Sequence, residues 1–282
     1  MRSLGRAKLP RLLAAIHDPP ARLYLRGGGA PSLLSRPAVA IVGARACSSY
    51  GAQVARMLGR ELAAAGLVVV SGLARGVDGE AHRGALEAEG TTVAVLGCGI
   101  DRDYPAAHAD LARRIAVAGL VVAEYPPGVE PAPWRFPARN RIIAGLTPAT
   151  VIVEARERSG ALITADFALE EGREVFVVPG EITSGLSTGT NRLLRVGATP
   201  LTSADDVLEA FGIERSPPQR VALDAVSACV LERVGDGAVT ADELARTTGL
   251  EAGAVASALT TLELGGLVAA GGGLYREVVP PK

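Results

Sequence analysis

Six short apolar runs recur along the first two thirds of the chain, and each run is continuous rather than alternating. Uninterrupted aliphatic runs of four or five residues are typical of strands that are buried on both faces of a parallel sheet. Between them, apolar residues recur three and four positions apart, as in amphipathic helices. The pattern predicts strands at Ala38–Val42, Leu67–Val70, Thr92–Leu96, Leu120–Ala123, Thr150–Val153 and Glu174–Val177.

The segments between these runs predict helices, which alternate with the strands. They lie at Ser49–Ala65, Val77–Glu89, Ala106–Ala118, Arg139–Gly145 and Leu162–Glu171, and Ser203–Phe211 forms a closing helix. Regular alternation of strand and helix is the signature of a doubly wound sheet with helices on both faces. We therefore expect an α/β domain with a doubly wound, mainly parallel sheet over residues 38–211.

Residues 1–37 precede this alternation and differ from it in charge. The first 38 residues hold seven cations against one anion, Asp18, a net charge of +6, whereas the whole chain has a formal net charge of −1. One short helix is expected over Leu9–Ile16. We interpret residues 1–37 as a short basic N-terminal extension ahead of the sheet.

A proline pair, Pro217-Pro218, separates the last part of the chain from the sheet and predicts a linker over residues 212–220. Helical patterns follow at Ala222–Val234, from Thr240 to Gly249 and at Glu251–Leu264, and a hairpin pattern follows at Leu267–Ala270 and Leu274–Val278. Three helices and a two-stranded wing are typical of a winged-helix domain. We expect such a small domain over residues 221–282.

Composition excludes several classes of protein. The three cysteines and three histidines show no ligand spacing, which argues against a disulfide framework and against a zinc site. There is no secretory signal pattern, and no uncharged apolar stretch reaches membrane-spanning length. We expect a cytoplasmic protein without a metal, a cofactor or a membrane partner.

The loop after the second predicted strand has the composition of an anion pocket. It reads Ser71-Gly72-Leu73-Ala74-Arg75-Gly76 and lies where a strand ends and a helix begins. Glycine lets a ligand approach the backbone, a helix N-terminus offers free N–H groups, and arginine adds a forked cation. Phosphate is the anion that suits this set best. The alternative interpretation is an ordinary connection between a strand and a helix.

Other predicted strands end in small residues too. The first is followed by Gly43-Ala44-Arg45, and the fifth by a segment that reaches Ser159-Gly160 at the start of a helix. Ligands of open parallel sheets bind beyond the carboxyl ends of the strands. Several glycine-rich ends in one sheet therefore predict a surface that a nucleic-acid backbone can approach closely.

Aromatic and cationic side chains interleave in Trp134-Arg135-Phe136-Pro137-Ala138-Arg139-Asn140-Arg141. Arginine pairs with phosphate, and an aromatic face stacks on a base without reading its identity. The segment thus favours binding of single-stranded nucleic acid. The alternative is that its aromatic residues anchor the core and its arginines pair with Glu124 or Glu154.

Motifs of the common nucleotide enzymes are absent. The chain has no complete dinucleotide-binding fingerprint, no Walker phosphate loop and no nucleophile elbow. Ser71 and His82 do not form a catalytic pair, because the helix of His82 should run away from Ser71. We expect no catalytic residue and a protein that is not an enzyme.

Five segments follow one another between residues 9 and 211: SGLARGVDGEAHRGAL, VAVLGCGIDRDYP, FPARNRIIAGL, EARERSGALITADFALEEGREVFVVPG and TGTNRLLRVGA. Together they resemble the DNA-processing protein A family, also called DprA or Smf. The resemblance implies an extended Rossmann-like domain that binds single-stranded DNA, protects incoming DNA and loads the RecA recombinase during natural transformation. It also implies a homodimer, and the C-terminal part resembles the winged-helix domain of many members.

The resemblance also implies binding residues. It implies a phosphate pocket with a rim at the start of the third motif, where Ala138 stands in place of the basic residue that many members carry. Asp78, Glu154 and Thr164 resemble residues that shape the pocket. With the strand-end residues, the predicted DNA- and phosphate-binding set is Gly43, Arg45, Ser71, Gly72, Ala74, Arg75, Gly76, Phe136, Arg139, Asn140, Arg141, Ser159 and Gly160.

A second hypothesis comes from another functional class. Pro179-Gly180 and Thr188-Gly189-Thr190 resemble the phosphate loop of the lysine-decarboxylase-like phosphoribohydrolases, which cleave nucleotide monophosphates. That group places a catalytic glutamate after its threonine turn, where this chain has Asn191 and Arg192. The substitution makes the hydrolase the weaker hypothesis.

The predicted winged-helix domain is acidic. Residues 217–282 hold five cations and eight acids, a net charge of −3, and the expected recognition helix, Glu251–Leu264, has no lysine or arginine. A module that neutralises phosphates should be basic. We therefore expect this domain to contact protein rather than duplex DNA.

Overall fold

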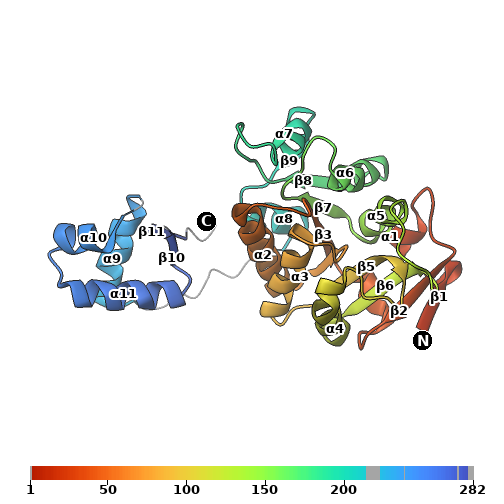
Figure 1. Ribbon diagram of the computed structural model, residues 1–282, viewed down its shortest axis with the longest axis horizontal. Coiled ribbons are helices and arrows are strands. Elements are labelled where there is room, and N and C mark those ends of the chain that lie inside the picture. The colour runs from red at the N-terminus through yellow and green to blue at the C-terminus, as the bar shows by residue number, and fades with distance from the viewer. Residues whose placement is uncertain (1, 214–222, 238, 272, 279–282) are drawn as a thin grey trace. The chain divides into compact units, whose positions relative to one another are not determined.

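The computed structural model describes residues 2–213, 223–237, 239–271 and 273–278 (Figure 1). Contacts divide the chain into two compact units, Met1–Arg215 and Ser216–Lys282. The predicted linker, residues 212–220, spans this division, and most of it lies outside the described residues. No helix in the described ranges is both long and apolar enough to cross a bilayer.

The larger unit is built on a nine-stranded sheet in the order β1-β2-β6-β5-β4-β3-β7-β8-β9. All six predicted strands are present in it, which confirms the doubly wound, mainly parallel, Rossmann-like fold. Their bounds are Ala38–Val42 for β3, Val68–Ser71 for β4, Thr92–Gly99 for β5, Leu120–Tyr125 for β6, Ala149–Ile152 for β7 and Glu174–Val177 for β8.

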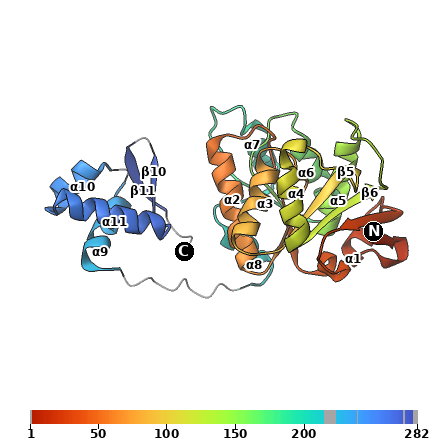
Figure 2. The same cartoon turned by 60° about the horizontal axis from the view of Figure 1, so that its bottom comes forward.

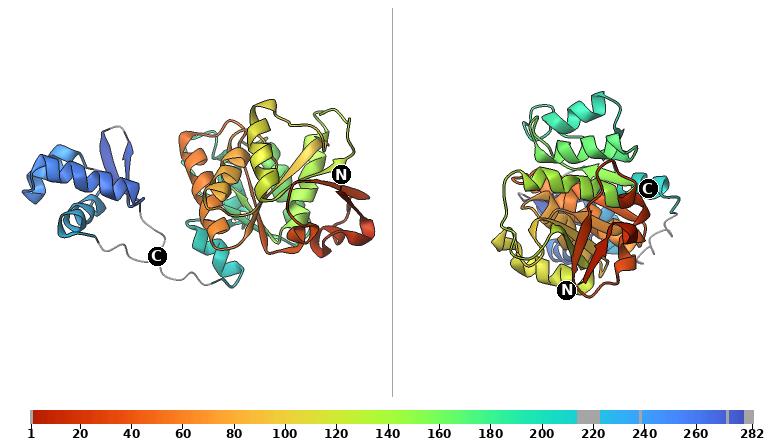
Figure 3. Two further views of the ribbon diagram at one scale, coloured as in Figure 1. Left: turned by 90° about the horizontal axis from the view of Figure 1, so that it is seen from below. Right: turned by 90° about the vertical axis from the view of Figure 1, so that its right-hand side faces the viewer.

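Two strands from the N-terminal segment extend this sheet, contrary to the expectation that it begins at Ala38. Strands β1 (Arg2–Gly5) and β2 (Arg22–Arg26) pair antiparallel, and β2 also pairs antiparallel with β6 (Figure 3, left, red). In β2, buried Leu23 and Leu25 alternate with more exposed residues. Such alternation marks a half-buried strand near a sheet edge, and a search for continuous apolar runs misses it.

Helices cover both faces of the sheet. One core cluster joins the sheet to α2 (Ser49–Ala64), α3 (Val77–Glu87) and α8 (Ala204–Ala210), and another joins it to α4 (Ala109–Ala118), which follows η3 (Ala106–His108). Figure 2 shows α2, α3 and α4 side by side on this face. The opposite face packs against α1 (Arg11–Ala14), α5 (Arg135–Leu146), α6 (Gly160–Glu170) and α7 (Thr188–Arg195).

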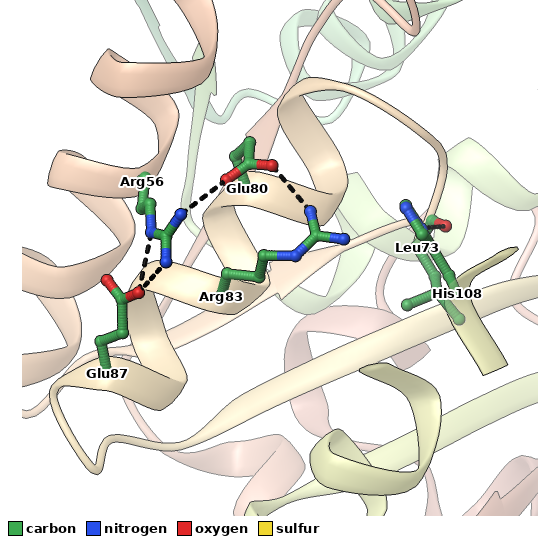
Figure 4. A network of polar contacts seen from close by, with 6 residues as sticks. All are labelled: Arg56, Leu73, Glu80, Arg83, Glu87 and His108. Carbon is green, nitrogen blue, oxygen red and sulfur yellow. Dashed lines mark hydrogen bonds and ion pairs between the residues drawn. The ribbon is translucent and has the colours of Figure 1, made fainter. Parts of the chain in front are cut away.

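Helices α2 and α3 cross closely and are tied by ion pairs. Arg56 of α2 contacts Glu80 at 3.6 Å and also pairs with Glu87, and Arg83 contacts Glu80 at 2.7 Å (Figure 4). These pairs are partly exposed, so each contributes little to stability. The pairs of Arg56 link α2 to α3, whose N-terminus follows the Ser71–Gly76 loop.

The direction of winding reverses at β3. Strands β4, β5 and β6 follow it on one side, whereas β7, β8 and the short β9 (Thr199–Pro200) follow on the other. The parallel partners β3 and β7 are in register from Val39 opposite Ala149 to Val42 opposite Ile152. Their carboxyl ends therefore lie next to each other at the topological switch point, where open α/β sheets bind ligands.

The smaller unit has the predicted winged-helix order. It contains α9 (Ala225–Gly235), α10 (Ala241–Thr248), α11 (Ala252–Leu264) and the antiparallel pair β10 (Val268–Gly271) and β11 (Leu274–Glu277). Its described apolar residues form a core of their own. Asp224 and Thr240 cap the first two helices, and Gly249 ends α10 in the left-handed conformation that favours glycine.

Candidate functional site

An open pocket of about 340 Å³ lies at the switch point, beyond the carboxyl ends of β3 and β7. Most of its lining comes from four segments: the loop after β3, the connection from β4 into α3, the start of α5, and the loop from β7 into α6. Among the predicted binding residues, the pocket is lined by Gly43, Arg45, Ala74, Phe136, Arg139, Asn140, Ser159 and Gly160. The structure thus brings together residues that lie more than a hundred positions apart in the sequence.

Three exposed arginines surround the pocket: Arg45, Arg156 and Arg158. In the described ranges none of their guanidinium groups has a carboxylate partner, whereas Arg26, Arg56 and Arg141 each pair with one. The lining contains a single acid, Asp78, whose carboxylate is buried and bonded to backbone N–H groups. The pocket therefore has an unbalanced positive charge, which suits a phosphate backbone.

The N-terminus of α6 adds to this positive character. Ser159 caps the helix by accepting a hydrogen bond from Ala161 N at 3.3 Å, and Gly160, Ala161 and Thr164 line the pocket. No acidic residue stands in the first turn. The helix dipole therefore places its positive end at the pocket without compensation from the protein itself.

An aromatic ring forms one wall. The Cζ atom of Arg45 lies over the ring of Phe136, 5.3 Å from its centroid, and Tyr104 stacks on the same ring with 5.2 Å between centroids. This arrangement joins a phosphate-binding cation to an aromatic cluster within one site. It is the combination that recognises single strands without reading their sequence.

Arg139 lines the pocket, but its guanidinium is buried and bonded inside the protein. It donates to Gly72 O at 2.6 Å and also to Val95 O, and its Nε donates to Asn140 Oδ1 at 3.2 Å. Burial lowers the pKa of Arg139 to about 10, so the side chain stays charged at neutral pH. Its position indicates a structural link between α5 and the ends of β4 and β5.

The buried carboxylate of Asp78 holds the Ser71–Gly76 loop through hydrogen bonds to its backbone. The carboxylate accepts from Gly72 N at 3.1 Å and from Ala74 N at 3.4 Å, and burial raises its pKa while Arg139 and these two bonds oppose the rise. The hydroxyl of Ser71 is fully buried and donates to Ile41 O at 2.6 Å. These polar groups are therefore engaged within the protein, and Ser71, Gly72 and Gly76 do not line the pocket.

Leu73, within this loop, has a positive φ of 59°, which is unusual for a residue with a side chain. Its side chain is fully buried, and its carbonyl oxygen lies 3.0 Å from Nδ1 of His108 (Figure 4). Core packing and this hydrogen bond together hold the loop in this unusual backbone conformation. The loop is therefore a rigid support for the pocket.

Two predicted arginines lie away from the pocket. Arg75 is exposed in the loop after β4 and does not line it. Arg141 pairs with Glu124 at 2.7 and 3.0 Å and with Asp18 at 2.8 Å, and it lines a separate cavity of about 460 Å³ beside α1. The alternative interpretation, in which an arginine of this segment pairs with Glu124, therefore describes Arg141.

Glu154, which the sequence resemblance implied as a residue that shapes the pocket, is buried just after β7 and does not itself line the pocket. Its carboxylate accepts from Ser48 N at 2.9 Å and from Ser48 Oγ at 2.5 Å. Ser48 also caps α2 by accepting from Gly51 N at 3.0 Å. This network fixes the segment that carries Arg45 against the loop that carries Arg156.

Sequence reasoning missed Arg156 and Arg158, although both lie in the segment EARERSG that the family resemblance included. The signal was available in principle, since two cations follow a buried strand and precede a helix. What the sequence did not show was that β7 pairs with β3 and so brings these cations opposite Arg45.

The model of the family described as DNA recombination-mediator protein A matches residues 1–212. The chain belongs to this family. A second family model, the DprA winged helix domain, matches residues 214–273, which agrees with the fold of the smaller unit.

Relatives within the family cover much of the chain. A putative DNA processing protein DprA of Mycobacterium tuberculosis is 46% identical over 85% of this chain and 64% of its own length. The chain thus spans less than two thirds of that relative. The protein Smf of Escherichia coli is 40% identical over 94% of this chain and 74% of its own length.

Two solved structures of the family share the fold. DNA processing protein A from Streptococcus pneumoniae is 43% identical, has a TM-score of 0.69, and covers 76% of this chain and 75% of its own. A second structure, at 33% identity and TM-score 0.68, covers 74% of this chain and 94% of its own. That structure is of DNA processing protein A from Helicobacter pylori and is described as giving insight into its single-stranded DNA binding mode.

Proposed function

We propose that this protein binds single-stranded DNA in the pocket at the switch point of its sheet. The observation that carries the proposal is the set of three exposed guanidinium groups, Arg45, Arg156 and Arg158, which surround a helix N-terminus and have no carboxylate partner among the described residues. The arginines hold consecutive phosphates, and the α6 N-terminus adds a further site for an anion. The Helicobacter pylori relative, whose title names single-stranded DNA binding, supports this assignment.

The proposal includes the biological role that the family resemblance implied. The protein protects incoming single strands as a homodimer and loads the RecA recombinase onto them in natural transformation. It works by binding and does not transform its substrate chemically. Because guanidinium groups contact phosphates rather than base edges, binding is strongly salt-dependent and largely independent of sequence.

The phosphoribohydrolase hypothesis is not favoured. Asn191 stands near the position at which that group has its catalytic glutamate, and its side chain exchanges hydrogen bonds with Gly180 N at 3.3 Å and Gly180 O at 3.0 Å. An amide in this position joins α7 to the end of β8 and has no carboxylate with which to act as a base or nucleophile. An assay that detected free base released from AMP by this protein would instead support the hydrolase hypothesis.

The proposed site is tested by fluorescence anisotropy with labelled single-stranded and duplex DNA. We expect single strands to bind more tightly, and Arg45→Ala or Arg156→Ala with Arg158→Ala to weaken binding by about tenfold per cation removed. Each lost phosphate contact should also lower the salt slope by about 0.7. Arg75→Ala, outside the pocket, should have a smaller effect.

Arg60 provides the matched control for removal of a positive charge. It is exposed on α2, about 16 Å along the helix from the end that faces the pocket. Arg60→Ala should leave both the affinity and the salt slope nearly unchanged. If Arg60→Ala weakened binding as much as Arg45→Ala, only net charge would matter, and the pocket would not be the site.

A further inference from the structure

Beyond the pocket, exposed aromatic rings continue along the same edge of the sheet. Trp134 is 62% exposed, and Tyr104 is 42% exposed. Neither residue belongs to the apolar core clusters of the described chain. A single exposed aromatic side chain is ordinary on a protein surface, whereas several aromatic side chains beside a cationic pocket indicate a surface that binds a partner.

Arg135 and Tyr125 hold the ring of Trp134 in place. The Cζ atom of Arg135 lies 4.7 Å from its centroid, and Tyr125 meets it edge-on with 6.4 Å between centroids and 87° between planes. Arg135 also lies over Tyr125, at 5.1 Å, and its guanidinium donates to Glu130 O. The indole is therefore pre-ordered by its neighbours, yet most of its surface stays open to solvent.

A second aromatic group connects this platform to the pocket. Phe136 lines the pocket, and its ring contacts both Arg45 and Tyr104. With two partners over its ring, Phe136 has less free face than Tyr104, which is the more exposed member of the stack. Trp134 lies two residues before Phe136, just ahead of α5. Tyr104 therefore joins the cationic site through Phe136, and Trp134 is placed beside it by its position in the chain.

We propose that Trp134 and Tyr104 are base-stacking platforms for nucleotides that flank the phosphates held in the pocket. This inference rests on the proposed function and adds to it the residues that hold the bases. Stacking on an aromatic face accepts all four bases, since each has a π-face, and it requires that they be unpaired. The platform thereby gives a physical reason for a preference for single strands over duplex.

A protein partner is the main competing occupant, because tryptophan, tyrosine and arginine are also common at protein interfaces. The observations favour DNA over this occupant. Arg45 contacts both the pocket and the aromatic stack, so a strand that follows the cations meets the rings within the same binding event. The competing occupant is retained as an outcome of the experiment.

The experiment uses Trp134 as its own reporter, because it is the only tryptophan in the chain. The full-length protein is titrated with unlabelled oligothymidylate of about 4 and about 16 nucleotides while tryptophan emission is recorded. We expect the longer oligonucleotide to quench emission with the midpoint that anisotropy gives for binding. The shorter one, if it occupies only the pocket, should quench less at equal saturation.

Substitutions then separate stacking from structure. Trp134→Ala and Tyr104→Ala should each weaken single-strand affinity by about 5- to 100-fold, and Trp134→Phe should restore most of the loss. Tyr50→Ala is the matched control, because Tyr50 is 52% exposed at the start of α2 but lies outside the pocket lining. A thermal unfolding curve for each variant verifies that it is folded.

The outcomes distinguish the stacking proposal from the proposed function. Tight binding of single-stranded DNA with unchanged tryptophan emission would contradict base stacking on Trp134 but leave the proposed function intact. If wild type binds no single-stranded DNA, both fail. If emission depends on protein concentration without DNA, the surface contacts a second copy, and the platform is again wrong. Equal losses in Tyr50→Ala and Tyr104→Ala also contradict it.

Discussion

The imidazole of His82 is fully buried between α3 and the sheet, and its tautomer can be assigned. The Thr92 hydroxyl donates to Val69 O at 2.7 Å, so it accepts from Nδ1 of His82 at 2.6 Å. The proton is therefore on Nδ1, and Nε2 is buried without a hydrogen-bond partner in the described chain. Burial lowers the pKa of His82 to about 3.

This assignment predicts a loss of stability in acid. The ordinary pKa of histidine is 6.5, so between pH 6.5 and about 3 the unfolded chain binds a proton that the folded chain does not. Above pH 6.5 protonation of His82 costs the folded state nothing. Below pH 6.5 the free energy of unfolding decreases by about 1.4 kcal/mol for each pH unit. Thermal unfolding of wild type and His82→Gln across this range should show a flatter pH dependence for the variant. Parallel curves would exclude His82 as the cause.

Arg139 and Gly72 show what sequence alone reveals about single residues. Both were predicted at a phosphate site, and each has the chemistry for one. In the structure they contact each other. Arg139 donates a hydrogen bond to Gly72 O, and the guanidinium fits there only because residue 72 has no side chain, since a Cβ on it would lie 2.5 Å away. The sequence shows which chemical groups are present. Whether a group faces solvent or a neighbouring carbonyl depends on tertiary packing, which no local pattern contains.

At the level of elements, α2 and α3 pack backbone to backbone through two glycines. A Cβ on Gly59 would collide with Ala81 O, and one on Gly84 would collide with Arg56 O. Both contacts are with main-chain atoms, which cannot rotate away. The position of α3, and with it the Ser71–Gly76 loop, therefore depends on the absence of side chains at this crossing.

Alanine at either position should separate these helices. We expect Gly59→Ala and Gly84→Ala each to destabilise the larger unit by about 1–3 kcal/mol despite the better helix propensity of alanine. Gly253→Ala in α11 is the control, because a Cβ there meets nothing within 4 Å, and it should stabilise by up to about 1 kcal/mol. Thermal unfolding measures all three. A stabilised Gly84→Ala variant would show that the crossing adapts freely.

Individual elements were largely predictable, whereas their neighbours in space were not. The bounds of β3 and β8 match the sequence prediction, since continuous aliphatic runs mark buried strands. Helix α7 was missed because its first residues, Thr188-Gly189-Thr190, resemble a turn. The order β4-β3-β7 follows from long-range pairing, and for this reason the candidate site was predicted with Arg45 but without Arg156.

At the level of the whole molecule, charge is divided unevenly between the two units. The positive pocket lies in the larger unit, whereas residues 217–282 have a net charge of −3 and α11 has no cation. We expect a chain that ends at residue 215 to keep its single-strand affinity within about twofold, since phosphate binding needs the pocket alone. Anisotropy titrations of both forms measure this. A large loss would assign DNA contacts to the winged-helix unit.

Net charge distinguishes the C-terminal part of the sequence, but it did not predict how far the sheet of the larger unit extends. Residues 1–37 were interpreted from their charge as an extension, whereas Leu23 and Leu25 are buried in a strand that pairs with β6. Net charge describes the exposed side chains of a segment and carries little information about its backbone pairing.

The placement of β7 beside β3 also bears on how the protein is made. During synthesis β3 emerges more than a hundred residues before its partner, so one edge of the growing sheet stays unpaired while β4, β5 and β6 are added. An unpaired edge is open to wrong partners, including other nascent chains. The pocket proposed to bind DNA needs segments from both sides of that edge. On that proposal, a nascent chain becomes able to bind DNA only after the ribosome has completed α6.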